Sequence, residues 1–279
     1  MDQRLASAAK IVDQLGAEHW AIIADWLQQL KANAGDATLD IAAAVPNSFD
    51  RFTCLVSGAA EAVGPLAHDV LEATGAAPSE SDLLTRAQRK LRLKRLGTWL
   101  EATEAGFDAG WWTAQSKRID DVRTIVPNSA AAELLWDWAD DHGAQFCCWL
   151  RRAINPATPY TEVAVTFTED ATKRWASVED ASGILGMDSF PQAVAPLVEE
   201  APAEKVALSV RLLEEGITRL AIVLLEPSPE TVTRAADLVS LDTQIADELG
   251  NAVGGAIARL EIAQTNAGLQ LDLRYDLTI

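Results

Sequence analysis

Cysteine is scarce in this chain, and the three cysteines present are poorly placed for a metal or a disulfide. Cys54 stands alone, while Cys147 and Cys148 are adjacent. This spacing offers neither a disulfide framework nor the ligand pairs of a zinc site. The three histidines are isolated and also lack metal-ligand spacing. We therefore expect a reducing compartment, with the cytoplasm as the default location.

Basic residues are scarce relative to acidic ones. The chain has 23 Lys and Arg against 41 Asp and Glu, a formal net charge of −18. Such a surface repels phosphate backbones and anionic lipid headgroups, so neither nucleic acid nor a membrane is expected as a partner. The simplest interpretation of this charge is an acidic surface that keeps the protein in solution.

Long apolar runs and the common nucleotide and hydrolase motifs are absent from the sequence. The longest aliphatic run, Leu220–Leu225, is too short to span a bilayer, and the first ten residues contain no apolar signal core. There is no Gly-x-Ser-x-Gly elbow, no P-loop and no Gly-x-Gly-x-x-Gly. These absences argue against an α/β-hydrolase, a P-loop NTPase and a dinucleotide-binding enzyme.

The clearest pattern that is present lies in residues 205–239. Apolar side chains alternate over 206–213 and again over 219–225, which predicts two strands that each have one apolar face. A three-residue loop at 214–216 suits a hairpin closed by its glycine. A helix capped at Ser228 is expected to follow.

The predicted hairpin register brings two arginines together. Arg211 should lie beside Arg219, on the face opposite Leu220 and the other apolar residues. Like charges opposite one another destabilise a sheet unless a carboxylate or an anion lies between them. Glu214 or Glu215 could supply that carboxylate.

Similar strand pairs, separated by helices, are expected along the rest of the chain. Residues 18–31 fit either a helix or a strand, and residues 242–264 fit either one long helix or a helix followed by a strand. The other expected strands are 37–46, 89–102, 105–115, 144–153, 160–168 and 269–279. The other expected helices cover residues 3–15, run from Asn47 or Ser48 to about Ala73, start at Ser79 or Ser81 and lead into the strand 89–102, and cover 129–142, 169–185 and 190–200.

This order of elements predicts an α+β protein. Hairpins linked by long helices favour an antiparallel sheet whose apolar face is covered by helices. A closed barrel would also remove the edge strands and direct the polar strand faces into a lumen. No linker or sharp change of composition divides the chain, so one domain over residues 1–279 is expected.

The repeated helix–hairpin–helix pattern resembles the ABBA aromatic prenyltransferases, which are built from α-β-β-α units around a ten-stranded antiparallel barrel. A local stretch is also similar to an early strand of the bacterial members. It runs from Thr38-Leu39-Asp40 through Val45-Pro46 to Ser48. The resemblance implies a closed barrel clad by helices.

The resemblance also implies a function, namely transfer of a prenyl group from an allylic diphosphate to an aromatic acceptor inside the lumen. Asp40 would then be a metal contact, holding Mg²⁺ if the reaction uses it. Tryptophan faces could stabilise the carbocation. The basic residues at lumen phases of predicted strands, which match the family's diphosphate ligands in kind, are Arg92, Lys94, Arg211, Arg219 and Arg274.

The chain departs from this family at two places. Trp111-Trp112 occupies a stretch where the family usually carries a lysine, and only Tyr160 and Tyr275 are available where family lumens use several tyrosines. A different function class is therefore also considered, a non-catalytic acidic or chaperone-like module that binds a protein partner. A closed lumen lined by Arg and Trp favours the enzyme, whereas an open sheet with solvated basic residues favours the module.

Overall fold

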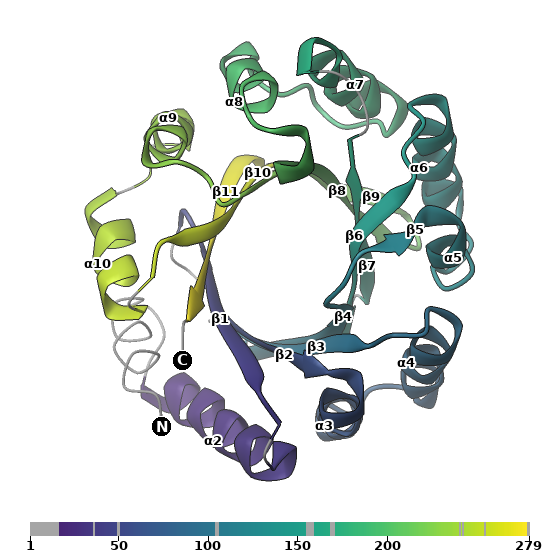
Figure 1. The fold of residues 1–279 in the computed structure, drawn as a ribbon, viewed down its shortest axis with the longest axis vertical. Helices are drawn as coiled ribbons and strands as arrows, with labels where there is room; N and C mark the ends of the chain where they lie inside the picture. The colour runs from purple at the N-terminus through teal and green to yellow at the C-terminus, as the bar shows by residue number, and fades with distance from the viewer. Residues whose placement is uncertain are drawn as a thin grey trace.

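Ten antiparallel strands close into a barrel in the computed structural model of the chain (Figure 1). The structure describes residues 17–35, 37–48, 51–103, 106–154, 159–167, 171–239, 241, 243–253 and 255–277. The strands are β1 (Leu39–Pro46), β2 (Arg51–Ala59), β3 (Arg95–Thr103), β4 (Gly106–Thr113), β6 (Phe146–Ile154), β7 (Tyr160–Thr166), β8 (Val206–Leu213), β9 (Gly216–Leu225), β10 (Ile257–Thr265) and β11 (Gly268–Leu277), and a short β5 (Lys117–Arg118) pairs outside the ring.

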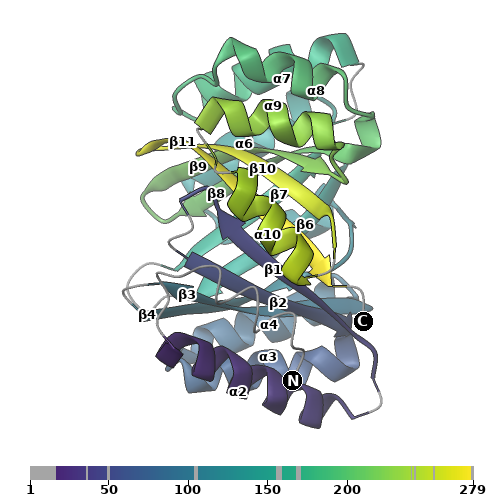
Figure 2. The ribbon, with the colours of Figure 1, turned by 90° about the vertical axis from the view of Figure 1, so that its left-hand side faces the viewer.

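Helices surround the barrel on its outside, as the end-on and side views show (Figures 1 and 2). They are α2 (Ala17–Ala34), α3 (Ala60–Ala73), α4 (Pro78–Lys90), α5 (Ile119–Arg123), α6 (Ala130–Asp141), α7 (Ala171–Ile184), α8 (Ala195–Glu199), α9 (Pro229–Val239) and α10 (Thr243–Val253), with single 3₁₀ turns at Gln192–Val194 and Ala203–Lys205. Among the described residues, no helix is long and apolar enough to cross a membrane.

Two pairings that are distant in sequence close the ring. The first strand, β1, pairs with the last, β11, through contacts such as Ile41 opposite Leu277. Strands β4 and β6 pair directly, with Trp112 opposite Arg151, although β5, α5 and α6 lie between them in the sequence. Each of the ten strands therefore has two hydrogen-bonded neighbours. The predicted α+β class and the closed, helix-clad barrel are confirmed.

The two faces of each strand have different neighbours. Val210, Leu220 and Ile222 lie on the outer face and are fully buried in the main hydrophobic core under the helices. The opposite face points into the lumen, where a smaller apolar cluster contains Trp99, Trp112 and Trp149 among small side chains. Alternation along the strands thus separates a helix-covered core from a lumen that also contains charged groups.

The predicted pairing of Arg211 with Arg219 is confirmed. The predicted three-residue loop is wrong, because Leu213 pairs with Gly216 and leaves a two-residue turn. The register shifts just after Arg211, so that β9 contains one extra residue, Thr218. This bulge restores the alignment of the apolar faces that a two-residue turn alone would have broken.

The predicted helix from Asn47 or Ser48 is wrong in its first part, because residues 51–59 form β2 and α3 begins only at Ala60. Seven consecutive residues of β2 are buried. Phe52 packs into the core under the helices, whereas Leu55 faces the lumen. A strand that is buried on both faces lacks the polar–apolar alternation that marks a half-exposed strand.

The two ambiguous segments are resolved by the structure. Residues 17–34 form the helix α2, whereas α10 covers Thr243–Val253 and β10 covers Ile257–Thr265. The C-terminal strand is confirmed over Gly268–Leu277, where Leu271 and Leu273 are fully buried. The Tyr275 hydroxyl donates a hydrogen bond of 3.0 Å to the Ala246 carbonyl of α10, so this ring packs under a helix and not in the lumen. The expected helix over residues 3–15, the side chain of Leu277 and residues 278–279 lie outside the described part.

Candidate functional site

Nearly every strand contributes a charged side chain to the lumen. Because a buried charge is costly unless it is paired, these groups must be neutralised by one another or by a bound ion. The lumen arginines are Arg51, Arg151, Arg211, Arg219, Arg259 and Arg274, and the lumen carboxylates include Glu101, Glu162, Glu261, Asp272 and Asp276.

Arg219 lies at the centre of an ion network and its side chain is 3% exposed. Its Nη2 donates to Glu261 Oε2 at 2.7 Å and to Asp272 Oδ2 at 2.8 Å. Arg211 Nη2 donates to Glu162 Oε2 at 3.2 Å, and the same oxygen lies 3.9 Å from Arg219 Nη1. The carboxylate between the paired arginines therefore comes from β7 rather than from the hairpin loop.

The network holds its members in their charged forms. Burial by itself would raise the pKa of Glu162, but Arg219 and Arg211 outweigh it, and the pKa of this carboxyl lies well below its usual range. Burial would lower the pKa of Arg219, yet Glu261 and Asp272 outweigh it and raise the pKa above its ordinary value. The central network is therefore ionised at neutral pH.

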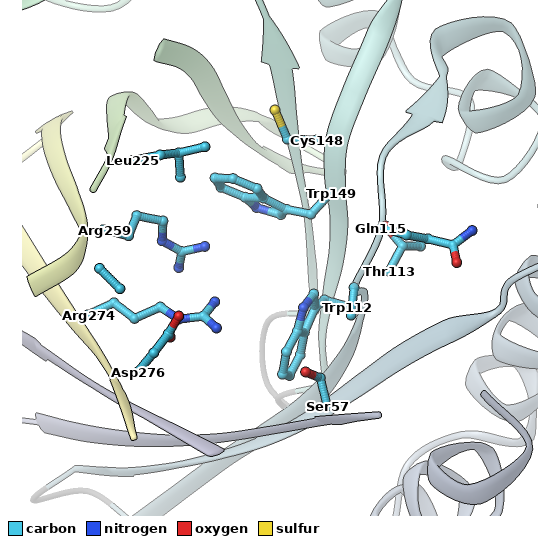
Figure 3. A pocket seen from close by; sticks show the side chains of 12 residues that line it. Ser57, Trp112, Thr113, Gln115, Cys148, Trp149, Leu225, Arg259, Arg274 and Asp276 are labelled. Atoms are coloured by element: carbon cyan, nitrogen blue, oxygen red, sulfur yellow. The ribbon is translucent and has the colours of Figure 1, made fainter. Parts of the chain in front are cut away.

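A cavity of about 310 Å³ opens at the end of the barrel where β4 passes into β5 and where β9 ends. We call it the outer cavity. Arg259 and Arg274 extend into it from β10 and β11 and face Trp112 and Trp149 on the opposite wall (Figure 3). Its lining also includes Ser57, Cys148, Leu225 and Asp276, whereas the Gln115 side chain turns away from it (Figure 3).

The two cavity arginines are held in place by different contacts. The Arg259 guanidinium stacks on the Trp149 ring, 4.6 Å from its centroid, and Nη2 lies 2.9 Å from Glu261 Oε1. Arg274 Nε donates to Asp276 Oδ1 at 3.0 Å. Stacking and ion pairing both restrict the guanidinium planes, which pre-organises the donors that face the cavity.

Arg274 is buried next to a second arginine. Burial, and next the nearby charge of Arg259, lower its pKa to about 10, although Asp276 opposes the shift. Burial is the larger cause of the lowered pKa, and repulsion between the two guanidinium groups adds to it. An anion between Arg259 and Arg274 would relieve that repulsion, so the outer cavity has the electrostatics of an anion site.

Glycines on β3 and β4 allow the lumen tryptophans to lie flat against the sheet. Gly97 pairs with Trp112, and Gly110 pairs with Trp99. A Cβ at Gly97 would lie 2.3 Å from the Trp112 ring, and one at Gly110 would lie 2.0 Å from the backbone oxygen of Arg152. The wall of the outer cavity therefore depends on a cross-strand glycine–tryptophan pair.

The structure separates the residues predicted to bind diphosphate. Arg274 faces the outer cavity, while Arg211, near the end of β8, and Arg219, near the start of β9, lie toward the other end of the barrel, in the ion network. The predicted strand position of Arg92 and Lys94 is wrong, because both are exposed in the turn between α4 and β3. Strand β3 begins only at Arg95, since residues 91–94 complete the end of α4 instead of pairing with a neighbour.

The predicted metal contact, Asp40, lies at the rim of the barrel. Its side chain is 63% exposed and forms an ion pair with Arg95. Within the described ranges, no group of three or more His, Cys, Asp and Glu side chains is arranged to hold a metal ion. The described residues around Asp40 therefore do not fit a Mg²⁺ site built by the protein alone, since Mg²⁺ requires several oxygen ligands.

Two residues of the outer cavity, Arg259 and Asp276, were not predicted from the sequence as site residues. Arg259 lies on the alternative strand at the end of residues 242–264, where Leu260 and Ile262 alternate with polar neighbours. Asp276 shares the phase of Arg274 on the last strand. Period-two alternation was enough to place Arg259 and Asp276 on strands. Their position close to Trp149 depends on how the strands pair around the barrel.

Comparisons with known proteins find a similar fold but no relative by sequence. No protein-family profile matches the chain, and no curated protein matches it in sequence. A solved structure entitled "Crystal structure of NotF prenyltransferase" matches with a TM-score of 0.56 at 9% identity, covering 86% of this chain and 81% of that one. At this identity the likeness shows a shared fold, that of a prenyltransferase-like barrel.

Proposed function

We propose that this protein binds an allylic diphosphate in the outer cavity and transfers its prenyl group to an aromatic acceptor. The observation that carries the proposal is the arrangement of Arg259 and Arg274 opposite Trp112 and Trp149 at the mouth of a closed barrel. This places anion-binding groups and aromatic faces in one partly enclosed space. The similarity in fold to a prenyltransferase supports the same assignment.

The reaction would begin with heterolysis of the bond between the allylic carbon and the diphosphate oxygen. The electron pair leaves with the diphosphate, whose growing negative charge is stabilised by the guanidinium groups of Arg259 and Arg274. The allylic cation forms beside Trp112 and Trp149, whose ring faces attract it. Water must be kept from the cation, because it would otherwise quench it.

The second step joins the cation to the acceptor. A ring carbon of the aromatic acceptor donates a π-electron pair to the allylic cation and forms the new carbon–carbon bond. The ring then loses a proton, and its aromaticity is restored. Asp276 lines the outer cavity and is our candidate acceptor for that proton. Arg274 fixes the orientation of this carboxylate through its Nε hydrogen bond.

The two arginines of the ion network have a different role in this proposal. Arg211 and Arg219 are already paired with carboxylates, so we assign them to positioning the network next to the outer cavity. Glu261 connects the two regions, because it contacts both Arg219 and Arg259. The alternative of a protein-binding module with solvated basic strand faces is disfavoured by the closed lumen.

The proposal is tested by calorimetry with dimethylallyl and geranyl diphosphates, followed by product analysis with a panel of phenols and indoles. Binding is expected for at least one diphosphate. Arg259→Gln and Arg274→Gln should each lower turnover by about two to three orders of magnitude, as for other preorganised charge stabilisers. The matched control is Arg234→Gln, which breaks an exposed ion pair with Glu200 on the outside of the molecule.

Each titration is run with and without Mg²⁺. A requirement for the ion would indicate that Mg²⁺ enters bound to the diphosphate, because the residues around Asp40 do not supply a ligand set. Absence of heat with both diphosphates, together with absence of product, would refute the enzyme assignment. Binding without any product would leave a diphosphate-binding protein.

A further inference from the structure

A cluster of basic side chains lies on the outside of the barrel, although the chain as a whole carries a net charge of −18. Between Asp82 and Glu101 the sequence has six basic residues and no acidic one. Two more basic residues, Lys117 and Arg118, form the short strand β5. We use the name basic patch for the following six residues: Arg89, Lys90, Arg92, Lys94, Lys117 and Arg118.

Contacts between two separate segments of the chain assemble the basic patch. Lys117 Nζ of β5 donates to the Arg92 carbonyl oxygen at 3.4 Å. Oε1 of Gln115 accepts hydrogen bonds of 2.9 Å from the backbone N–H groups of Lys94 and Arg95. The end of α4 and the turn after it therefore lie next to β5, on the outside of the barrel (Figure 1).

The charges of the basic patch are not neutralised by the described residues. Five of its side chains are exposed, and that of Lys117 is half-buried. None of the six forms an ion pair with any residue in the described ranges. The carboxylates that adjoin the patch in the chain, or through the backbone hydrogen bond from Ala60 to the Lys94 carbonyl, are those of Glu61, Asp120 and Asp121. Six cations thus adjoin three carboxylates, which leaves positive charge in excess.

The basic patch also holds like charges close together. Burial lowers the pKa of Lys117, Asp121 opposes this shift, and the positive charge of Lys94 lowers the pKa again. Lys94 and Lys117 are therefore near enough to repel one another. A carboxylate bound beside both ammonium groups would relieve this repulsion and form charge-assisted hydrogen bonds with them.

Arg92 has a backbone conformation that an arginine rarely adopts. Its φ angle is 47°, in the left-handed region. It directly follows Leu91, the C-cap of α4, at a position where glycine is the usual residue. Strained residues of this kind cluster at functional sites. Because the Arg92 side chain has no hydrogen bond or ion pair with any described residue, a ligand from outside the chain is the function that fits it.

The surroundings of the basic patch indicate which kind of ligand it fits. Phe146 lies opposite Arg118 in the pairing of β5 with β6 and is 44% exposed, so an apolar side chain can pack at the edge of the patch. Nucleic acid and anionic bilayers carry negative charge over a much wider area. They would meet the rest of the surface, which contains all 41 acidic residues. A short acidic polypeptide segment can remain within the patch.

We propose that the basic patch binds an acidic segment of a partner protein that also carries apolar side chains. Its carboxylates pair with the lysines and arginines, and its apolar side chains contact Phe146. The site does not depend on the proposed prenyl transfer, because it lies outside the lumen. The partner is held at the end of the barrel that contains the outer cavity, since Gln115 joins the patch to Thr113 and Ala114 in the cavity lining.

The test is fluorescence anisotropy with the full chain and a short labelled peptide of glutamates with interspersed leucines. Saturable binding is expected at low salt, and the affinity should fall about tenfold or more at physiological ionic strength, because the Debye length shortens. A single-stranded RNA oligonucleotide and vesicles of phosphatidylcholine and phosphatidylserine are titrated in parallel. Absence of peptide binding at low salt, or tighter binding of the RNA or of the vesicles, would overturn the proposal.

The matched variants carry the same change of net charge at different places. Lys90→Glu with Lys94→Glu should weaken peptide binding about tenfold or more. Lys31→Glu with Lys173→Glu, on exposed positions of α2 and α7, should leave the affinity within about twofold. An equal loss in both variants would assign the binding to overall charge and overturn the patch. A carbodiimide cross-link of the peptide to the unaltered chain is the second measurement, and peptide mapping should find it at Lys90, Lys94 and Lys117. Cross-links spread evenly to Lys31 and Lys173 would contradict the proposal.

Arg92→Gly separates binding from folding. The variant should have a higher Tm than the unaltered chain, because glycine adopts the left-handed conformation without strain. Its affinity for the peptide should nevertheless be lower, since one cation of the patch is lost. An unchanged affinity would count against the proposal.

Discussion

At the scale of single residues, Glu162 decides how two adjacent arginines can share one face of a sheet. Its carboxylate lies near both Arg211 and Arg219, and its side chain is 1% exposed. Without a negative charge there, the cross-strand pair of like charges would be destabilising. Three further carboxylates play similar roles for other lumen arginines, so the interior polarity of this barrel is largely self-neutralising.

Glu162→Gln is expected to lower the free energy of unfolding by about 3 kcal/mol, because loss of one partner leaves buried positive charge uncompensated. Urea denaturation at pH 7 measures the change. Glu200→Gln is the control, since it removes a carboxylate of similar size from an exposed ion pair with Arg234. An equal loss in both variants would contradict the special role of the buried group.

The same carboxylates predict a pH dependence. The pKa of Glu162 and that of Asp272 are lowered in the folded state, despite burial, by neighbouring arginines. Their stabilising contribution is therefore complete above the ordinary carboxyl pKa, about 4. It is lost as the pH falls below that value and the folded protein must take up protons. The slope of stability against pH between 5 and 3 should be smaller in Glu162→Gln than in the wild type.

Cys148 lines the outer cavity, so the reactivity of its thiol can report on ligand binding there. Burial raises its pKa to about 11, whereas Cys54 and Cys147 are fully buried and have pKa values raised further. At pH 8 the folded chain should react with a thiol reagent roughly a hundredfold more slowly than a free cysteine, first at Cys148. Dimethylallyl diphosphate should slow that reaction again, as peptide mapping can establish. Unchanged labelling with saturating diphosphate would place the ligand elsewhere.

At the scale of elements, the hairpin of β3 and β4 shapes the wall of the outer cavity. On its lumen face, glycine alternates with tryptophan along each strand, so that Gly97 lies opposite Trp112 and Trp99 opposite Gly110. The missing Cβ atoms give the indole rings room to cover the backbone. Both strands keep apolar residues on the outer face, including Leu96, Leu100 and Ala109, so the hairpin is anchored independently of its glycines.

Gly97→Ala is expected to displace the Trp112 ring, because the new methyl group would lie 2.3 Å from it. Overpacking of this kind costs about 1–3 kcal/mol of stability. Diphosphate affinity should fall at least tenfold while the arginines remain in place, which calorimetry and tryptophan fluorescence can measure. Gly183→Ala in α7 is the control, as nothing lies within 4 Å of a Cβ there. Native affinity in Gly97→Ala would show that Trp112 does not form the site.

At the scale of the whole molecule, closure of the barrel joins the two ends of the chain. Strand β1 pairs with β11 although more than two hundred residues separate them, and Arg51 forms an ion pair with Asp272 at 3.0 Å. Closure gives every strand two neighbours and encloses the charged lumen. Both the core and the site therefore depend on the last strand being present.

A chain that ends at Gly268 should not fold to the native state. It loses the buried side chains of Leu271, Leu273 and Tyr275, each of which contributes about 1.5–3 kcal/mol. It also exposes the edges of β1 and β10, which promotes aggregation. Circular dichroism and size-exclusion chromatography measure the outcome against a chain that ends at Leu277. Cooperative unfolding of the shorter chain at the wild-type temperature would contradict the role of β11 in closure.

The sequence by itself determined the local features of this protein. Period-two alternation located β8, β9 and β11, and matching of the apolar faces placed Arg211 beside Arg219, although the loop expected for that register was wrong. It failed at β2, where both faces are buried and the periodic signal disappears, and at Arg92, where the end of a helix resembled the start of a strand. Alternation reports which residues share a face, since it depends only on neighbouring positions in one strand.

Only the tertiary structure decided which groups surround each face of the strands. Ring closure turned the polar faces inward, brought Glu162 between two arginines, and placed Arg259 and Arg274 opposite Trp112 and Trp149. These contacts join strands that are far apart in sequence, and their geometry depends on strand order and register around the whole barrel. No local pattern encodes them, because the favourable energy of an ion pair or an aromatic contact exists only once the distant strands have been brought together.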